Sequence, residues 1–488
     1  MRQRVYTGAH FRRGVISVTL AFLGILLWLT LTGTVLAAAK RSIVFYTYER
    51  HNLKYWQKKV KEFNKENPGV EVKINSVVAG NYPEIVNLMF NVGNPPDLFM
   101  GGSLPIAELI KRNQLIPLDE LAPDRKTFQA WKARFPEEEV PWVEGTNVFN
   151  GKVYSFPWEG SSAHLVTYYN RTLFRKAGLN PDRGPTSWAE LREYARKVTT
   201  AGKGSFYGIT MGIKRPEVWD YQLQLAYASG WRYFDWRTGR FAFDNPIIRE
   251  FVQLFKDMKA EGSIFPGELS NDEPEMKMNF ALDRGAFYFG GPWDITVFPG
   301  YYPKVDFDVI LPPSKTGKMT GYYTRGPLAQ GRYYVSRSTN HPEVVWKFIE
   351  FITSADFWED YVRGGYGVSP FPEFSKPEYF ENPLLAKLAD LGSVPKIGPE
   401  SYWSPNQAAA WRRAFDVIEA VHPDLWETVQ GIYVGKAAFG ALTEVDRKQN
   451  EAWDKALAVA RSEGSKVTRA DFTYPDWDPT KNYVPKQK

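Results

Sequence analysis

The chain has 488 residues, no cysteine and a formal net charge of +6. The lack of cysteine excludes disulfides, thiolate catalysis, thiolate metal sites and a lipid-modified cysteine anchor, and the five histidines show no metal-ligand spacing. Residues 1–39 contain four arginines and no acidic residue, so the remaining chain carries a charge of only about +2, which argues against a nucleic-acid or polyanionic partner. The length beyond residue 39 predicts two or three domains.

Residues 1–39 are expected to be a targeting segment rather than part of the fold. Four arginines within residues 2–13 form a basic head, residues 15–36 carry no charge, and residues 37–39 are all alanine. This order is typical of a secretory signal peptide. An anchor that stays attached is the alternative, because about twenty apolar residues suffice to span a bilayer. In both cases we expect the rest of the chain to be exported, to a periplasm or to the cell surface.

Apolar runs and apolar spacing predict strands that alternate with helices along the chain. Early strands are expected at 42–47, 70–74 and 96–100, and early helices at 53–63, 82–92 and 106–113. Later strands are expected at 163–169, 207–210, 305–311 and 332–335, and later helices at 188–199, 247–260, 412–420 and 445–460, with another that starts at Pro342. Ser187 and Glu190 have the spacing of a capping box. The alternation predicts parallel sheets with helices on their faces.

Several motifs follow one another in an order that has a family resemblance. They are Asn94-Pro-Pro-Asp97-Leu-Phe-Met-Gly-Gly-Ser103, Asn150-Gly-Lys-Val-Tyr-Ser-Phe-Pro-Trp158, Pro185-Thr-Ser-Trp188-Ala-Glu190, Gly285-Ala-Phe-Tyr-Phe-Gly-Gly-Pro-Trp293 and Asn340-His-Pro-Glu-Val-Val-Trp346. The series spans roughly residues 42–460. It resembles the extracellular (periplasmic) solute-binding proteins of ABC importers, in the sugar-binding branch that includes the maltose-binding proteins.

The resemblance implies an α/β fold of the type II periplasmic-binding-protein class. Such a fold has two discontinuous α/β lobes with a ligand cleft at the hinge. By analogy, the N-terminal lobe is expected to hold 41–155 plus 302–355, and the C-terminal lobe 156–301 plus 356–485. The segments 371–399 and 471–488 look like additions to the family pattern that either wrap the second lobe or shape the cleft.

Candidate ligand contacts lie in the loops beyond the carboxyl ends of the expected strands, where open α/β sheets bind ligands. A sugar offers an apolar C–H face to an aromatic ring and a rim of hydroxyls to charged or amide groups, and the 17 Trp, 27 Tyr and 32 Phe of this chain suit such a ligand. The candidates are Tyr48, Glu49, Arg50, Tyr82, Gly102, Ser103, Trp158, Glu159, Trp219, Trp231, Trp293, Asp294, Arg325, Tyr366, Trp403 and Trp411.

Some candidates have a second interpretation. Glu49 and Arg50 also fit a surface ion pair, and Asp294 also fits a helix cap. In the family that the chain resembles, the tryptophan of a Gly-x-Trp motif stacks on the ligand, which implies this role for Trp293, and a late-helix aromatic at the position of Trp411 does the same. Trp56, Trp188 and Trp346 lie on expected helices at core spacing, so we expect them to be buried.

The function that the resemblance implies is capture of a carbohydrate, an oligosaccharide by preference, and its delivery to the permease subunits of an ABC importer. No cofactor, metal or catalytic activity is expected, and the chain is expected to be a monomer. The alternatives are a receptor for another small solute such as glycerol phosphate or a polyamine, a membrane-anchored ligand sensor, and an exported glycoside hydrolase that uses two of Glu49, Glu159 and Asp294. No nucleophile elbow, zinc-protease motif or Walker loop occurs in the sequence.

Overall fold

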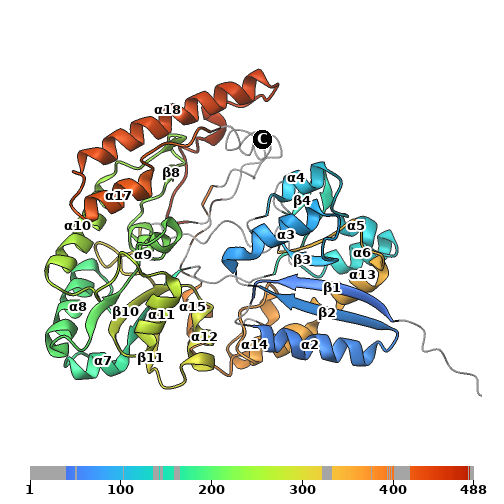
Figure 1. The fold of residues 1–488 in the computed structure, drawn as a ribbon, viewed down its shortest axis with the longest axis horizontal. Helices are drawn as coiled ribbons and strands as arrows, with labels where there is room; N and C mark the ends of the chain where they lie inside the picture. Colours follow the sequence, from blue (N-terminus) through green and yellow to red (C-terminus); the bar gives the residue numbers. More distant parts are fainter. Residues whose placement is uncertain are drawn as a thin grey trace, which may run out of the picture.

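The structure is a computed structural model that consists of two lobes, each built around its own sheet (Figure 1). It describes residues 40–49, 52–77, 79–102, 104–135, 142, 147–158, 165–320, 332–374, 376–392, 394, 396, 398–399, 418–481 and 483. Within these ranges no helix is long and apolar enough to cross a membrane.

The first lobe contains a four-stranded sheet of order β12-β3-β1-β2. β1 (Arg41–Thr47) is parallel to β2 (Val70–Ser76) and β3 (Leu98–Met100), because α2 (Leu53–Glu66) and α3 (Tyr82–Asn91) return the chain between them. β12 (Tyr333–Val335) is antiparallel to β3. The other elements of this lobe are the turn η1 (Ala79–Asn81), α4 (Ile106–Lys111), α5 (Leu118–Leu121), α6 (Arg125–Lys132), the hairpin β4 (Val148–Phe149) and β5 (Lys152–Val153), α13 (Pro342–Ile352), α14 (Ala355–Arg363) and the turns η2 (Pro372–Phe374) and η3 (Pro377–Tyr379).

The second lobe contains a four-stranded sheet of order β11-β6-β10-β7. β10 (Gly285–Gly290) is parallel to β7 (Tyr207–Thr210) and antiparallel to β6 (Val166–Asn170), which also pairs antiparallel with β11 (Phe307–Ile310). The other elements of this lobe are α7 (Arg171–Lys176), α8 (Trp188–Gly202), α9 (Pro216–Ala228), the hairpin β8 (Phe234–Asp235) and β9 (Arg240–Phe241), α10 (Pro246–Ala260), α11 (Glu273–Ala281), α12 (Asp294–Tyr301), α15 (Pro383–Leu391), α17 (Leu425–Tyr433), α18 (Gly440–Ser462) and the turn η4 (Arg469–Phe472).

Both sheets are mixed, whereas the alternation of strands and helices predicted parallel sheets. The exceptions have a common cause. β6 and β12 are the strands with which the chain enters each sheet from the other lobe, so they begin at the edge where β10 and β3 end. β3 and β10 begin at the opposite edge, because a helical crossover returns the chain there before each of them. β6 and β12 begin where β10 and β3 end, so they run in the opposite direction.

Each lobe has its own hydrophobic core. Trp56 and Trp346 are buried in the first core and Trp188 in the second, which confirms the expectation for all three. A smaller cluster joins Phe234 to α18 and to Phe472 of the C-terminal segment. The described part of the segment after residue 470 therefore wraps the second lobe, one of the two roles that the sequence left open.

The cores place the lobe boundaries differently from the expected ones. β11 pairs with β6, so residues 307–310 belong to the second lobe and not to the first. α14 and Phe374 pack in the first core, so the chain passes to the second lobe between Phe374 and Leu385 rather than at 356. The additional segment 371–399 thus contains this passage in its described part.

Local expectations were met in part. The early strands and helices are present, but α5, α6, α7, α9, α11, α12, α14, α15 and α17 were not predicted. Ser187 accepts a hydrogen bond from the backbone N–H of Glu190 at 3.2 Å. The Glu190 carboxylate binds the backbone N–H of Thr186 and not that of Ser187, so the capping box is only half formed. Of the helix expected at 412–420, residues 412–417 lie outside the described residues, and 418–420 are not helical.

Candidate functional site

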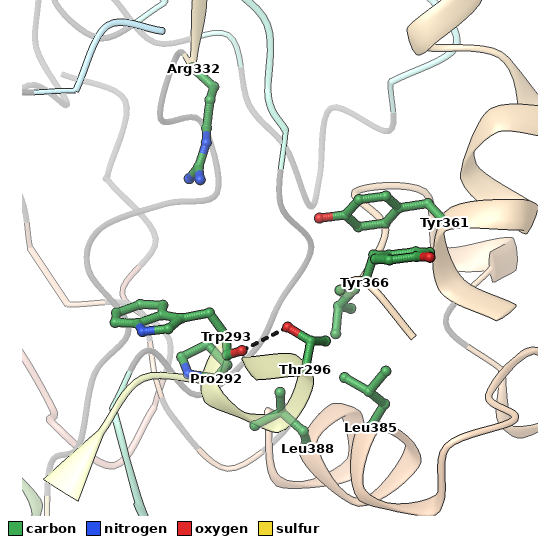
Figure 2. Close-up of a pocket in the computed structure, with 10 residues that line it drawn as sticks. Pro292, Trp293, Thr296, Arg332, Tyr361, Tyr366, Leu385 and Leu388 are labelled. Atoms are coloured by element: carbon green, nitrogen blue, oxygen red, sulfur yellow. Dashed lines mark hydrogen bonds between the residues drawn. The ribbon is translucent and has the colours of Figure 1, made fainter. Parts of the chain in front are cut away.

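A pocket between the lobes has an empty volume of about 540 Å³, which includes space open to solvent. The second lobe contributes the turn after β10 and the helix α15, and the first lobe contributes the residue before β12 and the segment around the end of α14 (Figures 1 and 2). The lining residues are Pro292, Trp293, Thr296, Arg332, Tyr361, Tyr366, Gly367, Val368, Leu385 and Leu388. Figure 2 shows Arg332 reaching from its strand toward Trp293, with Tyr361 and Tyr366 on the opposite side.

The turn that carries Trp293 is held by buried tyrosines of its own sheet. The hydroxyl of Tyr168 donates to the carbonyl of Gly291 at 2.7 Å, and the hydroxyl of Tyr288 donates to Oδ2 of Asp294 at 2.9 Å. Thr296 donates to the carbonyl of Trp293 at 2.8 Å. Burial raises the pKa of Tyr168 and Tyr288 well above the usual range, so both remain neutral donors. The half-buried indole therefore stands on a turn that is fixed before any ligand arrives.

Gly291 allows the ring of Trp293 to pack closely against the backbone of this turn. A Cβ at this position would lie 2.2 Å from Cη2 of Trp293, which no real contact permits. The indole thus lies directly over the backbone of the residue two positions earlier. The glycine sets where the ring of Trp293 lies, and not merely whether the turn can form.

Asp294 is fully buried and does not face the pocket as a free carboxylate. Its Oδ1 lies 2.6 Å from Nζ of Lys277, which also binds Glu273 at 3.1 Å. Burial raises the pKa of Asp294 to about 6, although the charge of Lys277 opposes this shift. Asp294 is the first residue of α12 and not its cap. Its contacts assign it to anchoring the Trp293 turn from behind.

Glu49 is paired with Arg332 across the first sheet. The Glu49 side chain is about 2% exposed, and its Oε1 lies 2.6 Å from Nη2 of Arg332. Its Oε2 accepts hydrogen bonds from the indole N–H of Trp56 at 2.8 Å and from the hydroxyl of Tyr333 at 3.3 Å. This burial contradicts the surface ion pair that the sequence allowed for Glu49 and Arg50. The Glu49 carboxylate binds the guanidinium of Arg332, a residue that lines the pocket.

Tyr48, Tyr82 and Gly102 gather at the carboxyl edge of the first sheet, as expected for residues that follow β1, β2 and β3. The rings of Tyr48 and Tyr82 meet edge to face at 5.0 Å. Gly102 has a φ of +48°, and a Cβ there would lie 2.9 Å from the Tyr48 ring. The hydroxyl of Tyr82 donates to the carbonyl of Met100 at 2.8 Å. Tyr82 is buried, so of these three only Tyr48 retains partial exposure as a side chain.

Three candidate tryptophans are core residues in this structure. Trp158 is 1% exposed and stacks on Trp56 with ring centroids 5.3 Å apart. Trp219 packs against aromatic residues of the second core, and Trp231 stacks on Tyr227. Their ring faces are occupied by protein, so this arrangement gives them no face for a ligand.

Six candidates lie outside the described residues: Arg50, Ser103, Glu159, Arg325, Trp403 and Trp411. Of the described candidates, the pocket brings together Trp293 and Tyr366. Arg332, Thr296, Tyr361, Leu385 and Leu388 also line it and were not predicted. A basic residue at the first position of an expected strand, 332–335, was the one available signal for Arg332. Among the described residues, no group of His, Asp and Glu could hold a metal ion.

Two α/β lobes with mixed sheets, joined by several passages of the chain and sharing one pocket, define a type II periplasmic-binding-protein fold. A family model described as bacterial extracellular solute-binding protein matches residues 49–357, more than half of the chain. The chain belongs to this family, as the order of its motifs indicated.

Known relatives bind different solutes. The sn-glycerol-3-phosphate-binding periplasmic protein UgpB of Salmonella typhimurium is 29% identical over 256 residues, which cover 51% of this chain and 56% of that protein. This chain therefore spans little more than half the length of that relative. The arabinooligosaccharide-binding protein of Bacillus subtilis is 24% identical over 353 residues, or 70% of this chain and 77% of that protein.

A solved structure confirms the fold. An ABC transporter solute-binding protein from Thermotoga lettingae, bound with alpha-D-tagatose, superposes with a TM-score of 0.63 and 20% sequence identity. The superposition covers 86% of this chain and 100% of that one. At this level of identity the likeness establishes the fold and not the ligand.

Proposed function

We propose that this chain is the substrate-binding component of an ABC importer and captures a carbohydrate, an oligosaccharide by preference, in the pocket between its lobes. The observation that carries the proposal is that Trp293 of the second lobe and Arg332 of the first lobe line the same pocket. An aromatic ring suits the C–H face of a sugar, and a guanidinium suits its hydroxyl rim.

Lobe closure follows from the distribution of these groups. A ligand that touches Trp293 first gains contacts to Arg332 and Tyr366 only when the lobes come together. Ligand shifts the equilibrium between open and closed forms by its differential affinity for the two. The permease subunits would then recognise the closed monomer, and no cofactor or covalent chemistry is required of the chain.

The relatives support a carbohydrate more broadly than a phosphate ester. The arabinooligosaccharide-binding relative matches over a larger share of this chain than UgpB does. A glycerol phosphate receptor is the second candidate, favoured by the identity to UgpB and by the presence of Arg332. Against a polyamine, the lining residues in the described part of the chain include no carboxylate.

The same lining argues against a glycoside hydrolase. Such an enzyme needs two carboxyl groups that flank the scissile bond. Glu49 and Asp294 are both buried in ion pairs beside the pocket, and neither lines it. A membrane-anchored sensor would require the N-terminal segment, which lies outside the described residues.

The test is isothermal titration of the purified protein with arabinooligosaccharides, maltotriose, tagatose, sn-glycerol 3-phosphate and putrescine. We expect binding of one carbohydrate class, and a rise in melting temperature with that ligand, since a ligand that binds only the folded state stabilises it. Binding of sn-glycerol 3-phosphate alone would keep a solute receptor and reject the carbohydrate. Release of reducing ends from an oligosaccharide would replace the receptor with a hydrolase.

A further inference from the structure

We propose that Glu49 sets the charge preference of the pocket: by pairing with Arg332 it makes the site select uncharged polyhydroxylated ligands and reject anionic ones. The inference rests on the proposed function and names the class of ligand that the pocket takes. It addresses a choice that the relatives leave open, because they include binders of both a phosphate ester and an oligosaccharide.

The geometry places the countercharge behind the cation and not in front of it. Arg332 is about 23% exposed and lines the pocket, whereas Glu49 is about 2% exposed and does not. Their charged atoms approach to 2.6 Å through Nη2 of the guanidinium. The ligand therefore meets hydrogen-bond donors of Arg332 while the net charge of the pair is zero.

The pair decides the charge of the described lining. Among the lining residues in the described part of the chain, Arg332 alone is charged, and the others are aromatic, aliphatic, glycine, proline or threonine. A guanidinium binds an anion most tightly when it donates two parallel N–H groups and no neighbouring carboxylate neutralises its charge. Here one terminal nitrogen already binds a carboxylate, which both uses a donor and cancels the field.

Glu49 is built to stay in this role. The indole N–H of Trp56 in α2 and the hydroxyl of Tyr333 in β12 donate to its Oε2, so the carboxylate is held from two different elements. Burial, together with the charge of Glu49, raises the pKa of Tyr333 well above the usual range and keeps it a neutral donor. The hydrogen bonds and the ion pair offset the lost hydration of this buried carboxylate, so it serves as the countercharge of Arg332.

A purely structural role for the pair would be to tie the end of β1 to the start of β12. That role predicts lower stability when Glu49 is replaced, and an equal loss of affinity for all ligands. The charge role predicts a change in the ratio of affinities for anionic and neutral ligands. The ratio is therefore the readout that separates the two.

The experiment compares the wild type with Glu49→Gln by titration with maltotriose, an arabinooligosaccharide, sn-glycerol 3-phosphate and inorganic phosphate. We expect the wild type to bind a neutral probe at least tenfold more tightly than either anion. In Glu49→Gln the affinity for the anions should rise at least tenfold relative to the neutral probe, and the gain should shrink at high salt. An unchanged ratio, or a wild type that prefers the phosphate ester, would overturn the proposal.

Glu268→Gln is the matched control, because Glu268 is also a buried glutamate, paired with Lys259 at 2.8 Å in the second lobe, and does not line the pocket. It should leave all ratios unchanged. If Glu49→Gln does not fold, Arg332→Gln at pH 8 removes the countercharge that Arg332 gives Glu49 and should make putrescine bind better than in the wild type; no gain would overturn the proposal. A wild type that binds no neutral or anionic probe, while Glu49→Gln binds inorganic phosphate, would reject the proposed function and keep the charge role.

Discussion

Trp293 and Arg332 line one pocket although they belong to different lobes and to sheets that share no strand. Trp293 follows β10 and Arg332 precedes β12, so each stands at the edge of its sheet that faces the other lobe. The pocket is therefore complete only when both lobes contribute. Mutations at the two positions should affect ligand binding far more than they affect the folding of either lobe.

Trp293→Ala should abolish most of the ligand affinity. The indole supplies the aromatic face of the pocket, and loss of such an anchor at a binding site costs about 2–4 kcal/mol, which is at least thirtyfold in affinity. The ring is half-buried, so the free energy of unfolding should change by less than about 1.5 kcal/mol. Titration calorimetry with the bound sugar, together with urea unfolding, checks both. Trp426→Ala, another partly buried tryptophan that does not line the pocket, is the control and should bind normally.

Gly291→Ala should weaken binding nearly as much as removal of the indole, although every lining side chain is kept. The added methyl group would lie 2.2 Å from Cη2 of Trp293, so the ring must move. The control is Gly300→Ala on α12, where a Cβ meets nothing within 4 Å. The prediction fails if the two alanine variants bind the ligand equally well in the same titration.

Tyr168→Phe should make the Trp293 turn less rigid while the aromatic ring stays in the core. The change leaves the carbonyl of Gly291 without its 2.7 Å hydrogen bond from Tyr168, which costs about 1–2 kcal/mol of stability. We expect a three- to tenfold weaker affinity, because the turn is no longer fixed before binding. Tyr433→Phe removes another buried hydroxyl of the same lobe, which binds Glu268. That control should lower stability and leave the affinity unchanged, and a loss of affinity in both variants would contradict the prediction.

Glu190 should stabilise the protein at neutral pH and not in acid. The backbone N–H of Thr186 donates to its carboxylate at 2.8 Å, Arg183 lies beside it, and these contacts lower the pKa of Glu190 to about 2. A lowered folded pKa adds stability that is present above the unfolded value near 4.5 and is lost as the pH falls toward 2.

Glu190→Gln should therefore cost about 1–2 kcal/mol at pH 7, after allowance for solvent screening, and progressively less between pH 4.5 and pH 2. Urea unfolding of both proteins across this range measures the difference. Glu193→Gln, which breaks an exposed pair with Lys197 on the same helix, should cost less than about 0.5 kcal/mol at every pH. A cost for Glu190→Gln that does not depend on pH would contradict the assignment.

Sequence patterns predicted the parts of the fold that depend on local periodicity. The alternation of β1, α2, β2, α3 and β3 can be predicted because each element has its own apolar pattern. The antiparallel direction of β6 and β12 cannot be predicted from the sequence pattern, since it follows from passages between the lobes and not from any property of the strands. Passages between the lobes leave no local sequence pattern, so the boundaries expected at 302 and 356 differ from those in the structure.

The site divides in a similar way. Trp293 and Tyr366 follow from motif and loop position, and both line the pocket. Trp158, Trp219 and Trp231 are the same residue type as Trp293, and only the packing around each ring assigns them to the cores. Arg332 depends on a partner 283 residues away, Glu49, and no local pattern carries a contact at that separation.

In the described part of the chain, the residues change lobe three times: between Trp158 and Leu165, between Ile310 and Tyr333, and between Phe374 and Leu385. A backbone break in any one of these passages would leave the other two as covalent links between the lobes. Limited proteolysis at a single passage should therefore yield two fragments on a denaturing gel and one particle of unchanged size in gel filtration. Neither lobe corresponds to one continuous gene segment, so neither can be produced by simple truncation from one end.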